Sequence, residues 1–268
     1  MLGRVDPMSY GNLSPLCTSL DIHLAVIAIL AGETPAEIYA DDVAAPTVAL
    51  ILPRNGHRVF LAGETADSAL IQDLRAMLLQ RFASPAEFLI YYGSPAWEAY
   101  LPLICEGLES TRANREHYTI TSSLPDWRGH LAPEWTVRQV DAALLAETNL
   151  GHLAELITEI GSESPSVEDF LQHKFGYCVQ QGSDLTGWCL SEYNHGTRCE
   201  VGIETLPDHQ RRGVALVTAS ALIEHAFANG ITTIGWHCWQ RNTASSALAM
   251  KLGGTLTAEY PVWYCRVP

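Results

Sequence analysis

One stretch of this sequence, residues 205–215, places proline, glycine and two adjacent arginines between two apolar runs. The run 201–206 has the character of a strand, and the run 214–228 has the pattern of a long helix. A strand that turns into a helix start directs several unpaired backbone N–H groups, and the positive end of the helix dipole, at one place. Gly213 lets a ligand approach the backbone closely, and the arginines add positive charge in a chain whose net charge is -14. The stretch therefore predicts a binding site for a diphosphate.

Two motifs in the second half of the chain resemble those of a known family. Residues 210–215, Gln-Arg-Arg-Gly-Val-Ala, resemble the Q/R-x-x-G-x-G/A loop of the GNAT (GCN5-related) N-acetyltransferases. Residues 242–254 resemble that family's second element, which begins at an asparagine and ends near K-L-G-F. Both occur in the family's order and at its spacing, which makes the resemblance more specific than one short glycine motif. Further similarity to the subfamily that includes zwittermicin-A resistance acetyltransferases lies at 203–205, 236–239 and 248–253.

The resemblance implies that acetyl-CoA is the cosubstrate. The backbone of the strand before the loop would pair with the pantetheine arm, and the loop would hold the diphosphate. Asn242 matches the family asparagine that contacts this arm and orders the last helix. Two alternatives stay open, because Gly213 could be an ordinary helix-entry glycine and Asn242 an ordinary N-cap. The predicted cofactor-binding residues are Ile203, Thr205, Gln210, Arg211, Arg212, Gly213, Val214, Ala215, Asn242 and Ser245.

The sequence departs from the family at the proton donor for the departing thiolate. Many GNAT enzymes place a tyrosine seven residues after the asparagine, and this chain has Ala249 there. Tyr260 and Tyr264, on the predicted closing strands, are the candidate substitutes. A thiolate can also leave without a dedicated acid, because the ordinary pKa of a thiol is only about 8.5.

Acetylation of an amine requires that the nitrogen lose a proton, so a base near the centre of the sheet would help. Glu204 and Glu200 lie on one face of the predicted strand, because side chains alternate with a period of two. Either could take the proton directly or through water, and both would attract a cationic amine. The alternative is a solvent-facing pair or a carboxylate that bonds polar groups of the sheet. Glu192 is a third, weaker candidate.

Other combinations of reactive residues indicate no separate chemistry. His237 and Cys238 are adjacent in a predicted strand, so they point to opposite faces and cannot easily form a nucleophile pair. We expect one core cysteine and one histidine in the pocket, and the flanking tryptophans in the core or the pocket wall. His195 and Cys199 lack the two further ligands that a zinc site needs, so we expect no metal.

The composition narrows the class of protein and of partner. With 268 residues, 47% of them hydrophobic and 17% charged, the chain can bury a sizeable core. The net charge of -14 argues against nucleic acid as a partner and favours a cationic small molecule. The seven cysteines form no C-x-x-C pair, which indicates a reducing compartment. No signal-peptide pattern opens the sequence, and the apolar run 22–31 is too short to span a membrane. We therefore expect a soluble, cytoplasmic protein.

The fold class expected is α/β, a GNAT fold with a mixed, centrally splayed β-sheet flanked by helices, preceded by a smaller α/β domain. Residues 1–122 are predicted to form this first domain, 123–133 a linker rich in Pro, Gly and Trp, and 134–268 the acetyl-CoA-binding domain. The first domain would wall an acceptor pocket or form the contact of a homodimer, with a pure scaffold as the alternative.

The elements expected in the first domain are a helix over 22–30 capped by Asp21, strands over 36–40, 47–52 and 57–61, a helix over 66–82, a strand over 87–92, a helix over 95–108 and a strand over 117–122. Those expected in the second domain are a strand over 135–141, a helix from Asp141 to 147, helices over 151–160 and 166–170, strands over 175–181, 185–192 and 197–206, a helix over 211–228, a strand over 231–238, a helix over 242–252, and a closing strand pair over 255–267 that turns near Tyr260 and Pro261.

The sequence thus predicts an acetyl-CoA-dependent N-acetyltransferase. A primary amine of a small molecule, antibiotic-like if the subfamily resemblance holds, would attack the thioester directly in a ternary complex with no metal. A longer acyl group is an alternative within the same chemistry. A module that binds acyl-CoA as a sensor without turnover, and a scaffold with no ligand, are alternatives of a different class.

Overall fold

The computed structural model describes residues 2–64 and 67–268. Contacts divide the chain into two compact units, one formed by Met1–Arg115 with Tyr260–Pro268 and the other by Glu116–Glu259. These units differ from the predicted segments, because the chain passes between them inside two long strands, β6 (Glu109–Ile120) and β12 (Thr255–Val267). The segment 123–133 lies within the second unit, where it contains the 3-10 turn η4 (Trp127–His130).

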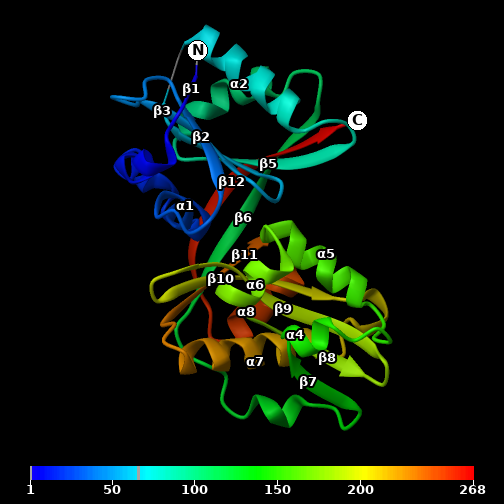
Figure 1. Cartoon of the computed structure of the whole chain (residues 1–268). Helices are drawn as coiled ribbons and strands as arrows, with labels where there is room; N and C mark the ends of the chain where they lie inside the picture. The colour runs from blue at the N-terminus through cyan, green and yellow to red at the C-terminus, as the bar shows by residue number, and fades with distance from the viewer. Residues whose placement is uncertain (1, 65–66) are drawn as a thin grey trace. The chain divides into compact units, whose positions relative to one another are not determined.

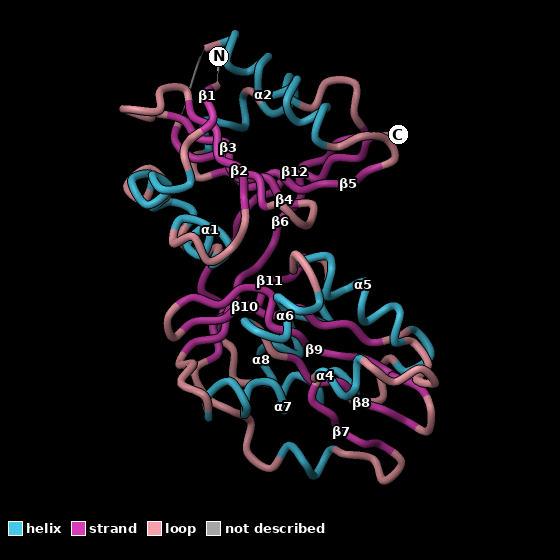
Figure 2. The backbone as a smooth tube through the Cα atoms, viewed as in Figure 1, coloured by secondary structure: helices cyan, strands magenta, loops and turns pink. Residues whose placement is uncertain are grey.

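The first unit is a twisted sheet in the order β1-β2-β3-β4-β5-β12. Neighbouring strands are antiparallel except β4 and β5, which are parallel. The elements are β1 (Gly3–Arg4), η1 (Pro7–Leu13), η2 (Thr18–Leu20), α1 (Leu24–Leu30), β2 (Ala36–Ala40), β3 (Val48–Pro53), β4 (Arg58–Gly63), α2 (Ser68–Arg81), β5 (Ala86–Tyr92), η3 (Pro95–Ala99) and α3 (Leu101–Ile104). Figure 2 shows these helices beside the strands of the unit.

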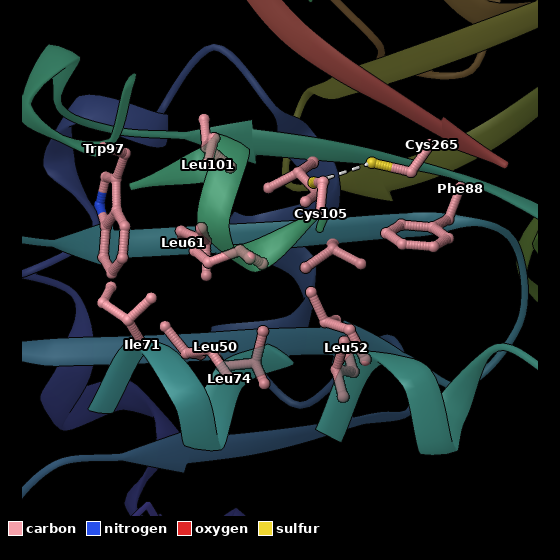
Figure 3. Close-up of a cluster of buried hydrophobic side chains, with 14 of the residues drawn as sticks. Leu50, Leu52, Leu61, Ile71, Leu74, Phe88, Trp97, Leu101, Cys105 and Cys265 are labelled. Atoms are coloured by element: carbon pink, nitrogen blue, oxygen red, sulfur yellow. Dashed lines mark hydrogen bonds between the residues drawn. The ribbon is translucent and has the colours of Figure 1, made fainter. Parts of the chain in front are cut away.

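The core of the first unit lies between the sheet and α2. Aliphatic side chains of β3 and β4 pack against Ile71 and Leu74 of α2, and Trp97 and Phe88 complete the cluster (Figure 3). At one end of this core the Sγ atoms of Cys105 and Cys265 are 3.2 Å apart.

The second unit is an open sheet in the order β12-β6-β11-β10-β9-β8-β7. The pair β10–β11 is parallel, and the pairs β9–β10, β8–β9 and β7–β8 are antiparallel. The elements are β7 (Trp135–Gln139), α4 (Ala142–Leu145), α5 (Leu153–Glu163), α6 (Val167–His173), β8 (Gly176–Gln181), β9 (Asp184–His195), β10 (Arg198–Thr205), η5 (Pro207–His209), α7 (Val214–Ala228), β11 (Thr233–Trp239) and α8 (Thr243–Lys251).

Helices cover both faces of this second sheet. One face packs its alternate residues, such as Val201 and Trp236, against the buried side of α7 and against α8. The opposite face packs Trp188 and Leu190 against α4, α5 and α6. Figure 1 shows α7 and α5 on opposite sides of the strands. This layering confirms the predicted α/β class and the sheet flanked by helices.

Several predicted elements differ from those observed. The strand predicted at 117–122 begins eight residues earlier, at Glu109, because its first half is polar and exposed and shows no apolar alternation. The segment 95–108 forms only short helical turns, η3 and α3. Helix α1 has His23 as its N-cap, so Asp21 does not cap it. The helix predicted from Ala66 begins at Ser68, and Ala66 itself lies outside the described residues.

The predicted closing strand pair was wrong, because β12 is one continuous strand. Pro261 lacks the N–H that a strand needs for its ladder, which suggested a turn. The ladder between β12 and β5 begins only at Trp263, so the missing donor falls outside it.

Candidate active site

The predicted diphosphate loop lies between β10 and α7 as expected. After β10, the 3-10 turn η5 leads to Arg211, which has a φ of 59°, and to Gly213, which has a φ of 98° and is the N-cap of α7. This left-handed backbone suits glycine and turns the chain sharply into the helix. In this fully described segment no side chain caps the first turn of α7, so its N–H groups face outward as donors. The local geometry is that of an anion site.

A cleft of about 460 Å³ joins this loop to the start of α8. It brings together almost all residues predicted for the cofactor, although 30 residues separate Gly213 from Thr243, the first residue of α8. Lys251, at the last turn of α8, also lines the cleft, although it is not among the residues predicted to bind the cofactor. The lining consists of Ile203, Glu204, Thr205, Gln210, Arg211, Gly213, Val214, Ala215, Leu216, Asn242, Ala244, Ser245, Leu248 and Lys251.

The two arginines of the loop are placed differently. Arg211 lines the cleft. Arg212 contacts the carboxylate of Glu134 at 3.4 Å and the Nδ1 of His209 at 3.3 Å, and its guanidinium lies over the ring of Trp135. The structure therefore puts Arg212 beside β7 and outside the cleft lining, because Glu134 offers it a carboxylate there.

Asn242 fills the capping role that its position predicted. Its Oδ1 accepts a hydrogen bond from the N–H of Ser245 at 3.2 Å, and both residues line the cleft. The indole N–H of Trp236 in turn donates to Ser245 Oγ at 3.0 Å. Trp236 is buried, which confirms its expected place in the core. The cap and the indole together fix the first turn of α8 against β11.

The two central parallel strands diverge beside this cleft. Pairing between β10 and β11 runs from Arg198 opposite Thr233 to Val201 opposite Trp236, and both strands then continue without it. The backbone of β10 beyond Val201 therefore has no parallel neighbour on this side, among the residues described. Gln210 donates its side-chain amide to the carbonyl of Thr205 at 3.2 Å, which ties the loop to the end of the divergent strand.

The two glutamates of β10 lie at different depths. Glu204 is exposed at the cleft, and the partial burial of its carboxyl raises its pKa. Glu200 is buried, and its Oε1 lies 3.2 Å from Nε2 of His237 on β11. The third candidate, Glu192, is the extra residue of a β-bulge in β9, and its carboxylate lies against Gly202.

Glu200 and His237 belong to a buried polar cluster that no local motif revealed. The rings of His237 and His117 stack with their centroids 4.4 Å apart, and His117 Nδ1 is 2.8 Å from Thr257 Oγ1. Gly235 makes this possible, because a Cβ there would lie 3.0 Å from both Glu200 Cγ and His117 Nε2. Burial, followed by the nearby His237, lowers the pKa of His117 to about 4, so His117 is neutral at pH 7.

The neighbour of His237 in the strand points the other way, as predicted. Cys238 Sγ is 3.5 Å from Ser246 Oγ in the core beneath α8. The same Ser246 donates to the carboxylate of Glu116 at 2.6 Å. The two strand faces therefore separate the cysteine from the histidine, which excludes a direct Cys238–His237 pair.

Ala249 and the two candidate proton donors, Tyr260 and Tyr264, have different surroundings. Ala249 is fully buried in the core of the second unit. Tyr260 contacts the rings of His23 and Tyr91, and a hydrogen bond to Glu87 raises the pKa of Tyr264. All these partners of the two tyrosines belong to the first unit.

Metal binding and membrane insertion would each need a recognisable group of residues. Among them, no three or more His, Cys, Asp or Glu side chains gather as a metal site would require. No helix over residues 2–64 and 67–268 combines the length and the apolar character needed to cross a membrane.

Comparison with known proteins identifies the family of the chain. A family model described as GNAT acetyltransferase matches residues 16–263. The chain is 26% identical over 265 residues to an uncharacterized N-acetyltransferase, YdfB, of Bacillus subtilis (strain 168), with 98% of each sequence covered.

Solved structures share the fold over the whole chain. A GCN5-related N-acetyltransferase-like protein of Streptococcus suis 89/1591 superposes with a TM-score of 0.74 at 20% identity, over 97% of this chain and 100% of that one. A tandem GNAT protein from the clavulanic acid biosynthesis pathway has a TM-score of 0.61 at 10% identity, over 100% and 99% of the two chains. With the family match over most of its length, this chain belongs to the GNAT acetyltransferase family and is an N-acetyltransferase of that family.

Proposed function

We propose that this protein transfers the acetyl group of acetyl-CoA to a primary amine of a small molecule, by direct attack in a ternary complex. The observation that carries the proposal is the cleft at the divergence of β10 and β11, where both family motifs meet. The uncapped first turn of α7 fits a diphosphate, and the single-sided edge of β10 fits the amides of the pantetheine arm. Arg211 and Lys251 supply the positive charge that phosphate groups require.

The face of β10 that bears Glu200 and Glu204 suits a cationic acceptor. Glu192 lies over Gly202 between them, so three carboxyl groups gather along one strand face. Such a face attracts an amine, and a carboxylate can accept the proton that the nitrogen must lose. An N–H of the divergent strand would stabilise the oxyanion of the tetrahedral intermediate.

Tyr264 and Tyr260 are the proposed proton donors for the departing thiolate. Tyr264 keeps its proton because its bond to Glu87 raises its pKa, and Tyr260 lies on the same strand. Replacement of each by Phe tests both. An unchanged kcat in both variants would mean that the thiolate leaves unaided, as its modest basicity allows.

The setting of the reaction is inferred from the composition. All seven cysteines are free and buried, which fits a reducing, cytoplasmic compartment. The resemblance to the zwittermicin-A resistance subfamily favours an aminopolyol acceptor, and a homodimer through the first unit is proposed with it. Acetylation of a panel of amines tests the aminopolyol acceptor. Sedimentation of the protein in solution tests the homodimer.

A sensor that binds acyl-CoA without turnover is favoured by one observation. The family position for the acid is Ala249, which is fully buried and cannot reach a ligand. Thiol release from acetyl-CoA and from longer acyl-CoA thioesters, measured with a panel of aminopolyols and polyamines, separates the two functions. A transferase releases thiol only when amine is present, and Gly213→Glu abolishes the release. A sensor binds acetyl-CoA but releases thiol at the uncatalysed rate.

A further inference from the structure

We propose that His237 is the general base of the transfer and that Glu200 is the residue that positions it. This inference rests on the proposed acetyltransferase function. It assigns to Glu200 an indirect role through the imidazole, and to His237 a role in the reaction that neither motif indicates.

Glu200 and His237 lie where the parallel pairing of β10 and β11 ends. Parallel pairing of β10 with β11 ends at Val201 and Trp236, so His237 is the first residue of β11 beyond the end of the ladder. Glu200, one residue before the last paired residue of β10, has its Oε1 3.2 Å from Nε2 of His237. The pair thus stands where the two strands begin to separate, beside the edge of β10 that the pantetheine arm is proposed to use.

The carboxylate of Glu200 selects one tautomer of the His237 ring. An ionised carboxylate only accepts hydrogen bonds, so the contact with Glu200 requires that Nε2 of His237 carry a hydrogen. The lone pair of the neutral ring is then at Nδ1, and that atom can take a proton from an amine. Glu200 also stabilises the imidazolium that results, as a buried carboxylate does when it orients a catalytic histidine.

Charged and titratable groups from three neighbouring strands lie around the cluster that contains the His237 ring. Glu200 and Arg198 face the cluster from β10, His117 faces it from β6, and Glu192 lies on the same face of β9. His117 stays neutral, and its contact with Thr257 holds it in place. A protonated His237 therefore meets no second imidazolium across the 4.4 Å stack. The side chain of His237 is 10% exposed, in contrast to the 4% of Glu200.

Transfer of the acetyl group from the thioester to the amine needs no further reactant. The substrate ammonium gives one proton to Nδ1 of His237, and the neutral nitrogen attacks the thioester carbonyl. A C–N bond forms, the C–S bond breaks, and the second proton lost by nitrogen goes to the departing thiolate. The products are the amide and the free thiol, and His237 returns its proton to solvent.

The test compares His237→Gln and Glu200→Gln with His225→Gln. His225 is a matched control, because it is a partly buried histidine of the same unit whose Nδ1 bonds to Tyr177 OH at 3.1 Å. Each variant is first titrated with acetyl-CoA to show that the cleft is intact. Thiol release with the most active amine of the panel then gives kcat and its pH profile. A glutamine can keep a hydrogen bond but cannot take a proton.

We expect kcat to fall about 100-fold or more in His237→Gln, with the dissociation constant for acetyl-CoA within about two-fold of the parent. Glu200→Gln should shift the acidic limb of the pH profile, His237→Gln should remove it, and His225→Gln should keep it. Exogenous imidazole should restore part of the rate in His237→Ala, which a structural role would not allow.

Contrary results fall into distinguishable groups. If the parent protein releases thiol and His237→Gln does so within about three-fold of it, with the same pH limb, the role of His237 is overturned and the acetyltransferase function stands. If the parent binds acetyl-CoA but acetylates no amine, the proposed function fails and this inference fails with it. If His237→Gln loses acetyl-CoA binding, two other measurements decide: the pH profile of Glu200→Gln and the rescue of His237→Ala by imidazole. If the acidic limb does not shift and imidazole restores no activity, the inference is overturned.

Discussion

The cofactor cleft and the Glu200–His237–His117 cluster occupy the same central strands but are built in opposite ways. The cleft is open and formed mainly by backbone, a positive-φ glycine and two helix starts, so its residues are near one another in sequence within each motif. The cluster is buried and formed by side chains from β6, β10 and β11, and its two nearest members in sequence, Glu200 and His237, are 37 residues apart. Binding by a shared cosubstrate needs the first kind of site. Acid–base chemistry needs the second, because only burial and fixed neighbours set a proton affinity.

The largest effect we expect is loss of acetyl-CoA binding in Gly213→Glu. The change places a side chain and a negative charge on a backbone with a φ of 98° where the diphosphate is proposed to lie. Binding should weaken at least about 100-fold, or roughly 3 kcal/mol, in isothermal titration. The control is Gly196→Glu, because Gly196 also has a positive φ of 57° and faces open space in a hairpin. Equal losses in both variants would refute the cleft as the site.

Gly235→Ala should disturb the buried cluster and leave acetyl-CoA binding in the cleft unchanged. The new methyl group would lie 3.0 Å from Glu200 Cγ and His117 Nε2 and must displace one of them. We expect kcat to fall roughly 10- to 100-fold while the affinity for acetyl-CoA changes less than about two-fold. Gly161→Ala in α5 is the control, since its Cβ would meet nothing within 4 Å. A fall in affinity as large as the fall in kcat would show that the regions are not separable.

Stability should depend on pH through His117. Its pKa of about 4 in the folded protein lies below the ordinary 6.5, so the unfolded chain binds more protons between these values. The contribution of neutral His117 to the free energy of unfolding is therefore fully present above about pH 6.5 and is lost as the pH falls toward 4. At pH 5 the free energy of unfolding should be lower by about 2 kcal/mol than at neutral pH. Urea unfolding at pH 7 and pH 5 measures this loss. His117→Gln should reduce it, and an unchanged loss in that variant would assign it to other groups.

The smallest effect concerns the two arginines of the loop. Arg211→Gln should weaken acetyl-CoA binding about five-fold, or roughly 1 kcal/mol, and the difference should shrink at high salt because the charge is exposed. Arg212→Gln is the matched control, since Arg212 pairs with Glu134 and should change affinity by less than about two-fold. If Arg212→Gln weakens acetyl-CoA binding more than Arg211→Gln does, the loop must change conformation when the ligand binds.

Local signals made the cleft and its supporting elements predictable. The glycine at 213 fixes a turn, Asn242 caps a helix, and the apolar periods of β10 and α7 show in the sequence. The strand 36–40 was predicted to the residue for the same reason.

Features set by distant pairing were not predictable in this way. The polar first half of β6 and the continuity of β12 through Pro261 depend on neighbours far away in sequence, and with them the boundary between the units. The orientation of Arg212 depends on Glu134, and the pairing of Glu200 with His237 depends on strand register.

The most direct measurement of the central claim is initial-rate kinetics of thiol release with acetyl-CoA and an amine varied together. The account predicts double-reciprocal lines that intersect, because both substrates must be bound before the amine attacks the thioester. Gly213→Glu should abolish the rate at every amine concentration. Parallel lines, which mark an acetylated enzyme intermediate, would contradict direct transfer across the divergence of β10 and β11.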